Sequence, residues 1–257
     1  MKNYFLLLMF VASSGLMAQD PTFVGHRGAS WLAPENTVAS VQLAWEIGAP
    51  AAECDIMLTA DKQIVVFHDK DGKRLTGHDF KMNQVPYDSI RYHSILLKDT
   101  NQEKYRGETI PLLSDLLAII PHDRTLVIEI KTGPEILPFL EKVISEHHKS
   151  GNIAFIAFDF ETILATKAIY PEIPCFYLSA FRLDIKNKFV KIAASDLDGV
   201  NLRHNIVSKK LVRKFRKADK AVWCWTVNNP EDARKVIDAG VTAITTDRPA
   251  WLKDQLQ

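Results

Sequence analysis

The sequence predicts a (β/α)8 barrel, an α/β fold that typically takes about 250 residues. From residue 22 onward, short β-branched or aromatic runs alternate with longer amphipathic stretches, which indicates parallel strands with helices outside them. At 257 residues and 47% hydrophobic residues, the chain is long and apolar enough for one barrel with a full core. No internal repeat or interdomain linker divides it.

Nine runs have the composition of strands. They are residues 23–25, 52–58, 64–67, 126–130, 153–157, 175–178, 199–202, 222–227 and 243–246. Between most of them lie stretches with a 3.6-residue apolar period, which predict helices at 37–47, 112–120, 136–148, 160–169, 188–194, 209–218 and 230–239.

The short link between residues 58 and 64 shows that only eight of the nine strands can be parallel, the number that a (β/α)8 barrel needs. A parallel crossover needs a dozen or more residues, so this link must be a hairpin and 64–67 an antiparallel partner of 52–58. Eight parallel strands remain, and an open doubly wound sheet is the alternative. Pairing symmetrically about the turn would set Phe67 opposite Asp55, whereas a slip of one residue would set His68 there.

Residues 69–109 interrupt the alternation of strands and helices. This segment is polar, contains turn pairs such as Asp71-Gly72, and has only a weak helical pattern near 87–94. Long structureless loops are uncommon inside compact domains. We therefore expect a polar excursion over the mouth of the barrel.

The first 18 residues have the pattern of a signal peptide. A charged start at Lys2 precedes an apolar run and small residues, with a cleavage site predicted after Ala18. This predicts export to a periplasm or out of the cell, one domain over 19–257, and no stable membrane insertion after cleavage. An uncleaved anchor is the alternative. The three cysteines, Cys54, Cys175 and Cys224, lie in separate strand-like runs and are expected to be buried thiols.

The charge balance limits the class of partner. With 32 Lys and Arg against 31 Asp and Glu, the net charge is +1, which argues against a broad surface for nucleic acid. A local anion site stays open, because net charge does not describe one pocket. We expect a small-molecule substrate.

Three carboxylates suggest a metal site at the strand ends, where barrel enzymes place their chemistry. Glu53 and Asp55 are two residues apart on one predicted strand, so both side chains point to the same face. Glu129 ends another strand. Buried acidic groups are costly without a cation, and three oxygen ligands suit Mg²⁺ or Ca²⁺. The alternative is simple ion pairing with Arg27 or Lys131.

Other strand ends supply acid–base and anion-binding groups. His26 and His68 lie beside the predicted metal site and suit general acid–base chemistry near neutral pH. Arg27 and Lys131 can hold phosphate oxygens. Trp225 offers a flat apolar wall for a small carbon skeleton such as glycerol, and plain core packing is the alternative.

Six blocks of sequence in order carry a family resemblance. They are 25–29 with 33–37, 53–55 with 65–69, Ile110-Pro111-Leu112-Leu113, Glu129-Ile130-Lys131, Trp225-Thr226-Val227-Asn228, and Thr246-Asp247-Arg248-Pro249. Together they resemble the glycerophosphodiester phosphodiesterase family over nearly all of the mature chain, from about residue 23 to 251.

The resemblance implies hydrolysis of glycerophosphodiesters to sn-glycerol 3-phosphate and an alcohol, in glycerophospholipid metabolism, with one divalent cation. It assigns the cation to the three carboxylates, acid–base catalysis to the two histidines, and phosphate binding to Arg27 and Lys131. The substrate's own glycerol hydroxyl can attack phosphorus in such enzymes. One departure is Ala157-Phe158, where many members have Ser-Phe, which predicts the loss of a hydroxyl near the pocket.

Two other functions fit the same residues. A phospholipase D-like lipid phosphodiesterase would need an apolar rim or insertion that touches membrane, and segment 69–109 shows no clear apolar wedge. A catalytically inert binder of phosphorylated polyols would have lost a ligand or a histidine, and none is missing here.

Overall fold

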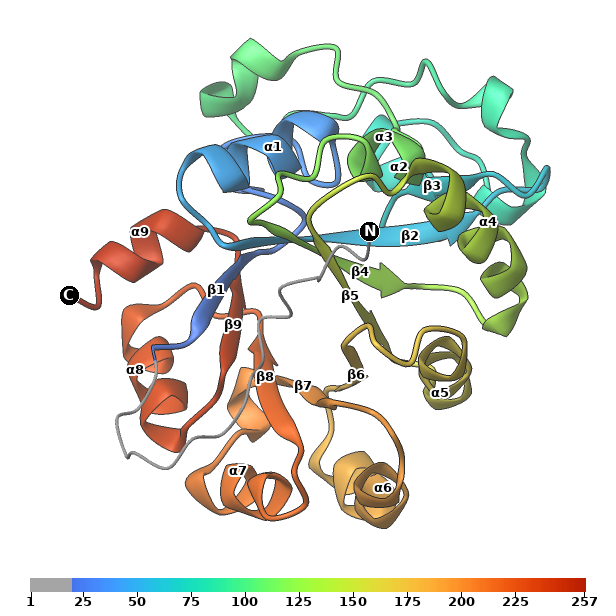
Figure 1. The fold of residues 1–257 in the computed structure, drawn as a ribbon. Coiled ribbons are helices and arrows are strands. Elements are labelled where there is room, and N and C mark those ends of the chain that lie inside the picture. The colour runs from blue at the N-terminus through green and yellow to red at the C-terminus, as the bar shows by residue number, and fades with distance from the viewer. Residues whose placement is uncertain (1–19) are drawn as a thin grey trace, which may run out of the picture.

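A closed barrel forms the centre of the computed structural model, which describes residues 20–257 (Figure 1). Strand β1 pairs in parallel with both β9 and β2, and this closes the sheet. The eight parallel strands are β1 (Thr22–Gly25), β2 (Ala51–Leu58), β4 (Thr125–Ile130), β5 (Asn152–Ala157), β6 (Cys175–Ser179), β7 (Gly199–Arg203), β8 (Ala221–Trp225) and β9 (Ala243–Thr246). The predicted (β/α)8 barrel is therefore confirmed, while the predicted signal peptide 1–18 lies outside the described residues.

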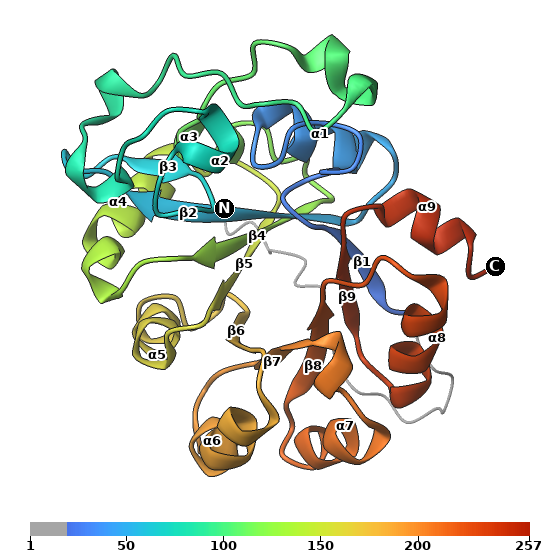
Figure 2. The ribbon, with the colours of Figure 1, turned by 180° about the vertical axis from the view of Figure 1, so that it is seen from behind.

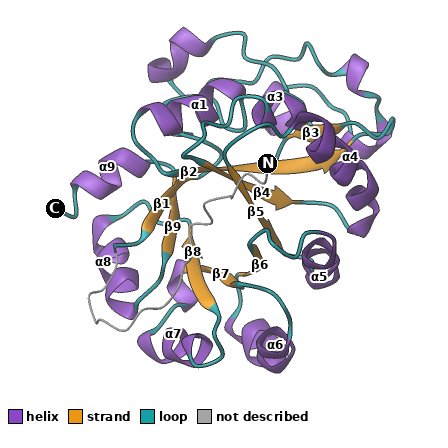
Figure 3. Cartoon of the chain, viewed as in Figure 1, coloured by secondary structure: helices purple, strands orange, loops and turns teal. Residues whose placement is uncertain are grey.

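Helices surround the barrel in both opposite views (Figures 2 and 3). They are α1 (Val38–Glu46), α3 (Leu113–Leu117), α4 (Leu137–His147), α5 (Phe160–Ile169), α6 (Arg182–Ala194), α7 (Lys209–Arg216), α8 (Pro230–Ala239) and α9 (Pro249–Asp254). Local sequence starts several of them, because Thr37, Asp159 and Ser208 each accept a backbone N–H of the first turn.

Two of the helices that surround the barrel differ from the prediction. Helix α6 begins at Arg182, six residues before the predicted start. The prediction missed its first turns because they expose Leu183 and bury only Ile185, so the sequence there shows no clear apolar period. Helix α9 was not predicted. It is short, and it begins at Pro249, a residue that favours the first turn of a helix.

The hairpin pairs symmetrically about its turn. Strand β3 (Ile64–Val66) runs antiparallel to β2, with Ile56 opposite Val66 and Leu58 opposite Ile64. The Phe67 amide donates to the Asp55 carbonyl at 2.9 Å, so Phe67 lies opposite Asp55. This confirms the symmetric register and excludes the one-residue slip.

Apolar side chains form three separate cores. The largest fills the space between the sheet and the helices, where the three cysteines are buried as free thiols, as predicted. A smaller core of residues such as Val127, Ile156 and Phe176 fills the barrel interior. The interior is therefore packed rather than open, and polar groups gather above it at the carboxyl ends of the strands.

The third core lies beneath the excursion. Leu75, Met82 and Ile90 pack with Met57 and Phe67, on the part of β2 that continues beyond the barrel. The segment contains α2 (Lys73–Thr76) and short 3-10 turns such as Tyr87–Ser89, the only regular structure within the predicted helical stretch 87–94. Both views place it to one side of the barrel, outside β3, rather than over the mouth, because its apolar residues need the extended hairpin as a packing surface (Figures 1 and 2).

Within residues 20–257, every helix is too short or too polar to cross a lipid bilayer.

Candidate active site

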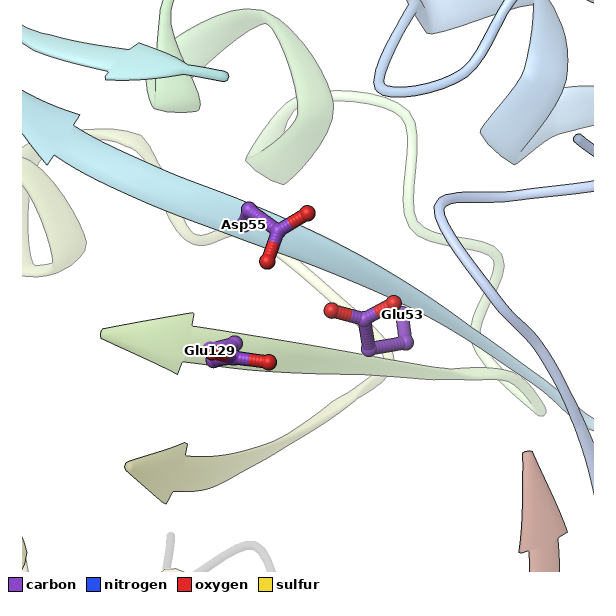
Figure 4. A group of neighbouring side chains, drawn as sticks. All are labelled: Glu53, Asp55 and Glu129. Atoms are coloured by element: carbon purple, nitrogen blue, oxygen red, sulfur yellow. The ribbon is translucent and has the colours of Figure 1, made fainter. Parts of the chain in front are cut away.

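Three carboxylates meet at the mouth of the barrel (Figure 4). Glu53 and Asp55 come from β2, and the parallel register places Glu129 of β4 beside Asp55. One carboxylate oxygen from each residue lies within 4.8 Å of the others. All three side chains are buried. The prediction that Glu53 and Asp55 point to one face of their strand, near Glu129, is therefore confirmed.

The electrostatics of this three-carboxylate cluster favour a cation. Burial, together with the neighbouring Asp55 and Glu129, raises the pKa of Glu53 well above its usual value. Burial and the charge of Asp55 raise the pKa of Glu129 to about 7. The Glu53 Oε1 atom is buried without a hydrogen-bond partner among the described residues. A divalent cation fits this donor set, because it would supply the missing partner and relieve the repulsion.

The loop after β1 holds two of these carboxylates in place. The Arg27 amide donates to Glu53 Oε2 at 2.8 Å. The Asn36 Nδ2 donates to Asp55 Oδ2 at 2.8 Å, and the Asp55 amide donates back to Asn36 Oδ1 at 3.0 Å. Arg27 and Asn36 have φ angles of 54° and 59°, a conformation that non-glycine residues rarely adopt. Such backbone strain concentrates at functional sites.

Gly28 allows the same loop to pack against helix α1. Its φ is +80°, and a Cβ atom there would lie 2.3 Å from the backbone carbon of Ser40. The Gly28 amide also donates to the Glu53 carbonyl at 3.0 Å. Only glycine accommodates both the positive φ and the close approach to Ser40, which explains the glycine that follows His26-Arg27.

Two cations neutralise part of the carboxylate charge. Arg27 Nε lies 3.2 Å from Asp55 Oδ2, and Lys131 Nζ lies 2.7 Å from Glu129 Oε1 and 3.5 Å from Asp55 Oδ1. Burial alone would raise the pKa of Asp55, but these two cations hold it below its usual value. Both cations therefore pair with acids in this structure, and phosphate binding would be an additional role.

A fourth buried carboxylate, Glu35, contacts several cations at the rim of the mouth. Glu35 is 2% exposed and contacts three positive groups: Arg27 at 2.5 Å, Arg74 at 2.8 Å and Lys98 at 3.1 Å. Burial opposes its ionisation, but hydrogen bonds from Arg74 and the charges of Arg27 and Lys98 lower its pKa far below the usual value. Glu35 thus ties the excursion to the phosphate-binding candidate Arg27.

Each histidine is backed by a carboxylate. His26 Nδ1 lies 2.7 Å from Asp247 Oδ1, and His68 Nδ1 lies 2.6 Å from Asp69 Oδ1. Hydrogen bonds lower the pKa of Asp247 to about 2 despite its burial, and they also lower that of Asp69. Both acids are therefore carboxylates at neutral pH, so each Nδ1–H donates and each Nε2 stays available for proton transfer. Burial also lowers the pKa of His68, which favours its neutral form.

An aromatic wall completes the mouth. Trp225 donates from Nε1 to the Asn201 carbonyl at 3.2 Å and meets Phe158 edge-on, with 5.5 Å between ring centroids. Phe158 is 43% exposed, and Lys131 Nζ lies 5.8 Å from its ring centroid. Ala157 is fully buried against the helices and faces away from the mouth, so the expected loss of a pocket hydroxyl was wrong.

Sequence reasoning missed the partner groups rather than the central ones. Asn36, Glu35 and Asp247 all stand in the blocks that carry the family resemblance, but periodicity and residue type give them no role. Asp247 directly follows a predicted strand, and this strand-end position was the available signal. Its distance of 221 residues from His26 hid the pairing.

The fold and the site define an enzyme of the (β/α)8-barrel class. At its mouth lie buried carboxylates, two histidines that each contact an aspartate, and two cations. Residues 26–251 match the model of the glycerophosphoryl diester phosphodiesterase family, and the chain belongs to that family.

Individual relatives match this sequence over nearly the whole chain. It is 30% identical over 240 residues to YhdW of Bacillus subtilis, and 29% identical over 234 residues to the glycerophosphodiester phosphodiesterase of Caldanaerobacter subterraneus; each match covers 89% of this chain and 95% of the relative. It also resembles the structure of an Oleispira antarctica phosphodiesterase in complex with the product sn-glycerol-3-phosphate. The TM-score is 0.80 at 25% identity, over 92% of this chain and 96% of that one.

Proposed function

We propose that this protein hydrolyses glycerophosphodiesters to sn-glycerol 3-phosphate and an alcohol. One observation carries the proposal: a buried cluster of three carboxylates lies in the same mouth as two histidines that each have a carboxylate behind them. Family membership and the product complex of the Oleispira antarctica relative support the substrate class. An inert binder would not need two histidines prepared for proton transfer.

The three-carboxylate cluster would hold one divalent cation, Mg²⁺ or Ca²⁺. When bound, such an ion polarises a phosphoryl oxygen and lowers the pKa of a contacting hydroxyl. Arg27 and Lys131 both contact Asp55 of this cluster, and this proximity to the cation supports the proposal that they stabilise charge on the equatorial phosphate oxygens.

The two histidines divide the proton transfers. An oxygen nucleophile attacks phosphorus, and one histidine Nε2 accepts its proton as the new P–O bond forms. The second histidine donates a proton to the departing alcohol oxygen as the old P–O bond breaks. Asp247 and Asp69 keep a proton on each Nδ1. The histidine that acts as base therefore starts neutral with a free Nε2, whereas the histidine that acts as acid starts as the imidazolium and donates its Nε2 proton. Trp225 and Phe158 provide an apolar wall for the glycerol carbons.

A coupled assay tests this proposal. Release of sn-glycerol 3-phosphate from glycerophosphocholine and glycerophosphoethanolamine would be measured with Mg²⁺, with Ca²⁺ and with EDTA. Metal-dependent release is the expected result. A parallel reaction with lysophosphatidylcholine, followed by choline release because the acyl chain stays on the phosphate product, tests the alternative of a lipid phosphodiesterase. No release of sn-glycerol 3-phosphate from either glycerophosphodiester with either cation would refute the proposal.

Single histidine variants test the mechanism. His26→Ala and His68→Ala should each lower turnover by roughly 10²–10⁴-fold, the usual contribution of one general acid or base. His148→Ala is the matched control, because this histidine lies just beyond α4 and away from the mouth. Wild-type turnover in either active-site variant would contradict the two-histidine mechanism.

We also propose that the protein is exported. The charged start, apolar run and small residues of the first 18 positions support this. Sequencing the N-terminus of the mature protein should find Gln19 first, and an intact Met1 in the mature protein would contradict cleavage.

A further inference from the structure

The near-zero net charge hides a strong asymmetry. Residues 181–220 contain 12 Lys and Arg against four Asp and no Glu, a net charge of +8, whereas the whole chain has +1. These residues include α6, β7 and α7. One sector of the barrel is therefore strongly basic and the remainder of the chain is acidic.

Half of these cations lie on the outer face of α7 and at its C-cap, Lys217. Six cations are exposed there: Lys209, Lys210, Arg213, Lys214, Arg216 and Lys217. None of them forms an ion pair with a carboxylate within residues 20–257, although such pairs occur elsewhere on the surface. The inner face of the helix packs through Val212 and Phe215, so the positive charge is directed outward.

The neighbouring helix adds exposed apolar side chains. Phe181, Leu183 and Val190 are 71%, 66% and 75% exposed, on α6 and at its N-cap. Lys186 and Lys191 of the same helix are also exposed. Leu183 and Val190 are seven residues apart, which places them on one face of α6, two turns from each other.

The two helices form one continuous surface. They lie side by side on the outside of the barrel in both views (Figures 1 and 2). Phe189 of α6 meets Phe215 of α7 at 5.2 Å between ring centroids, and Lys214 Nζ lies 3.5 Å from the Phe189 ring centroid. We call this surface, made of Phe181, Leu183, Val190 and the exposed cations of α6 and α7, the α6–α7 face.

We propose that the α6–α7 face binds the surface of an anionic lipid bilayer. Lysine and arginine side chains attract anionic headgroups, while the exposed apolar side chains enter the boundary between headgroups and acyl chains. Phe181 stands just beyond the carboxyl end of β6 and Leu183 lies in the first turn of α6, so these two apolar residues lie at the same end of the barrel as the active site, with Val190 two turns further from it. Bilayer binding through this face holds the mouth close to the lipid surface without a membrane-spanning segment.

The apolar residues favour a bilayer over a nucleic acid. Nucleic-acid surfaces combine cations with hydrogen-bonding or stacking side chains, whereas exposed leucine and valine gain little from a phosphate backbone. A bilayer surface uses both the cations and the apolar side chains.

Vesicle co-sedimentation with the purified full chain tests this inference. Vesicles of phosphatidylcholine alone are compared with vesicles that also contain phosphatidylglycerol, because an apolar contact alone would bind both alike. We expect preferential binding to the anionic vesicles that weakens as salt rises. Lys210→Glu with Lys217→Glu should lower the partition coefficient at least about 30-fold, since each surface lysine contributes roughly a factor of five.

Matched variants separate the face from general charge. Lys142→Glu with Lys149→Glu makes the same change in net charge near α4, where both lysines are exposed, and should retain binding. Leu183→Ser with Val190→Ser should weaken vesicle binding and leave binding to a DNA duplex unchanged. All variants should hydrolyse a soluble glycerophosphodiester at the wild-type rate, which keeps this test independent of the proposed function.

Three outcomes would overturn the inference. They are equal binding to both kinds of vesicle, equal losses in the α4 and α7 variants, and tight binding to the DNA duplex without vesicle binding.

Discussion

Replacing Asp247 with Asn tests whether the carboxylate behind His26 is needed as a charge. Asp247 accepts hydrogen bonds from His26 and Ser30 on Oδ1 and from Asn228 Nδ2 on Oδ2. The side-chain amide of Asn228 cannot flip to offer its oxygen to residue 247, because its Oδ1 already accepts hydrogen bonds from the Thr246 hydroxyl and the Asp247 amide. An asparagine at 247 has one acceptor oxygen, so one side of it must place an NH₂ group against another donor.

The size of the stability effect follows from the pKa. Asp247 has a pKa of about 2 instead of the usual 3.8, despite the opposing effect of burial. At about 1.4 kcal/mol per pH unit, the interactions of the carboxylate stabilise the fold by about 2 kcal/mol at neutral pH. Because the folded pKa is lowered, this stabilisation is complete above about pH 3.8 and is lost as the pH falls through about 2.

Urea unfolding of wild type and Asp247→Asn at a series of pH values measures this effect. The free energies of unfolding should differ by about 2 kcal/mol at pH 7, and the difference should shrink as the pH falls below 3.8. Turnover should also fall by roughly 10²–10⁴-fold, because the His26 tautomer is no longer fixed. Asp196→Asn, at an exposed position before β7, is the control and should show neither change. A difference between Asp247→Asn and wild type that is the same at pH 3 and pH 7 would refute the reasoning.

Three further predictions concern the site. Glu35→Ala should destabilise the fold by about 3 kcal/mol in urea unfolding, because it leaves the buried guanidinium of Arg27 partly unpaired; stability within 0.5 kcal/mol, roughly the scatter of neutral substitutions, would contradict this. Asn36→Ala should weaken cation binding in calorimetry by roughly 10–100-fold, since it removes both hydrogen bonds to Asp55, and an unchanged affinity would show that these bonds do not orient the ligand. Adding Mg²⁺ or Ca²⁺ should raise the melting temperature and EDTA should reverse the increase, whereas no response would argue against a cation in the three-carboxylate cluster.

The barrel was predictable because its determinants are local. Strand and helix periods are visible in single segments, and the five-residue link after Leu58 permits only a hairpin. The alternation of side chains along a strand is equally local, and it is enough to put Glu53 and Asp55 on one face. The family blocks then suggested roles for residues that periodicity alone left open.

The surfaces were less predictable because they combine distant segments. The net charge of +1 gave no sign of a face with six exposed cations on α7 and at its C-cap, since acidic residues elsewhere in the chain cancel their charge. The polarity of segment 69–109 likewise concealed its own apolar core with Met57 and Phe67.

By itself, the sequence determined the fold class, the hairpin and the three-carboxylate cluster at the centre of the candidate site, because these depend on periodicity, loop length and residue chemistry. Only the tertiary structure decided which groups are partners. It placed Asp247 against His26 across 221 residues and set Glu129 beside Asp55 through the register of β2 and β4. Closing the barrel brings the first and last strands together, and no local feature of the sequence between them shows that they are neighbours.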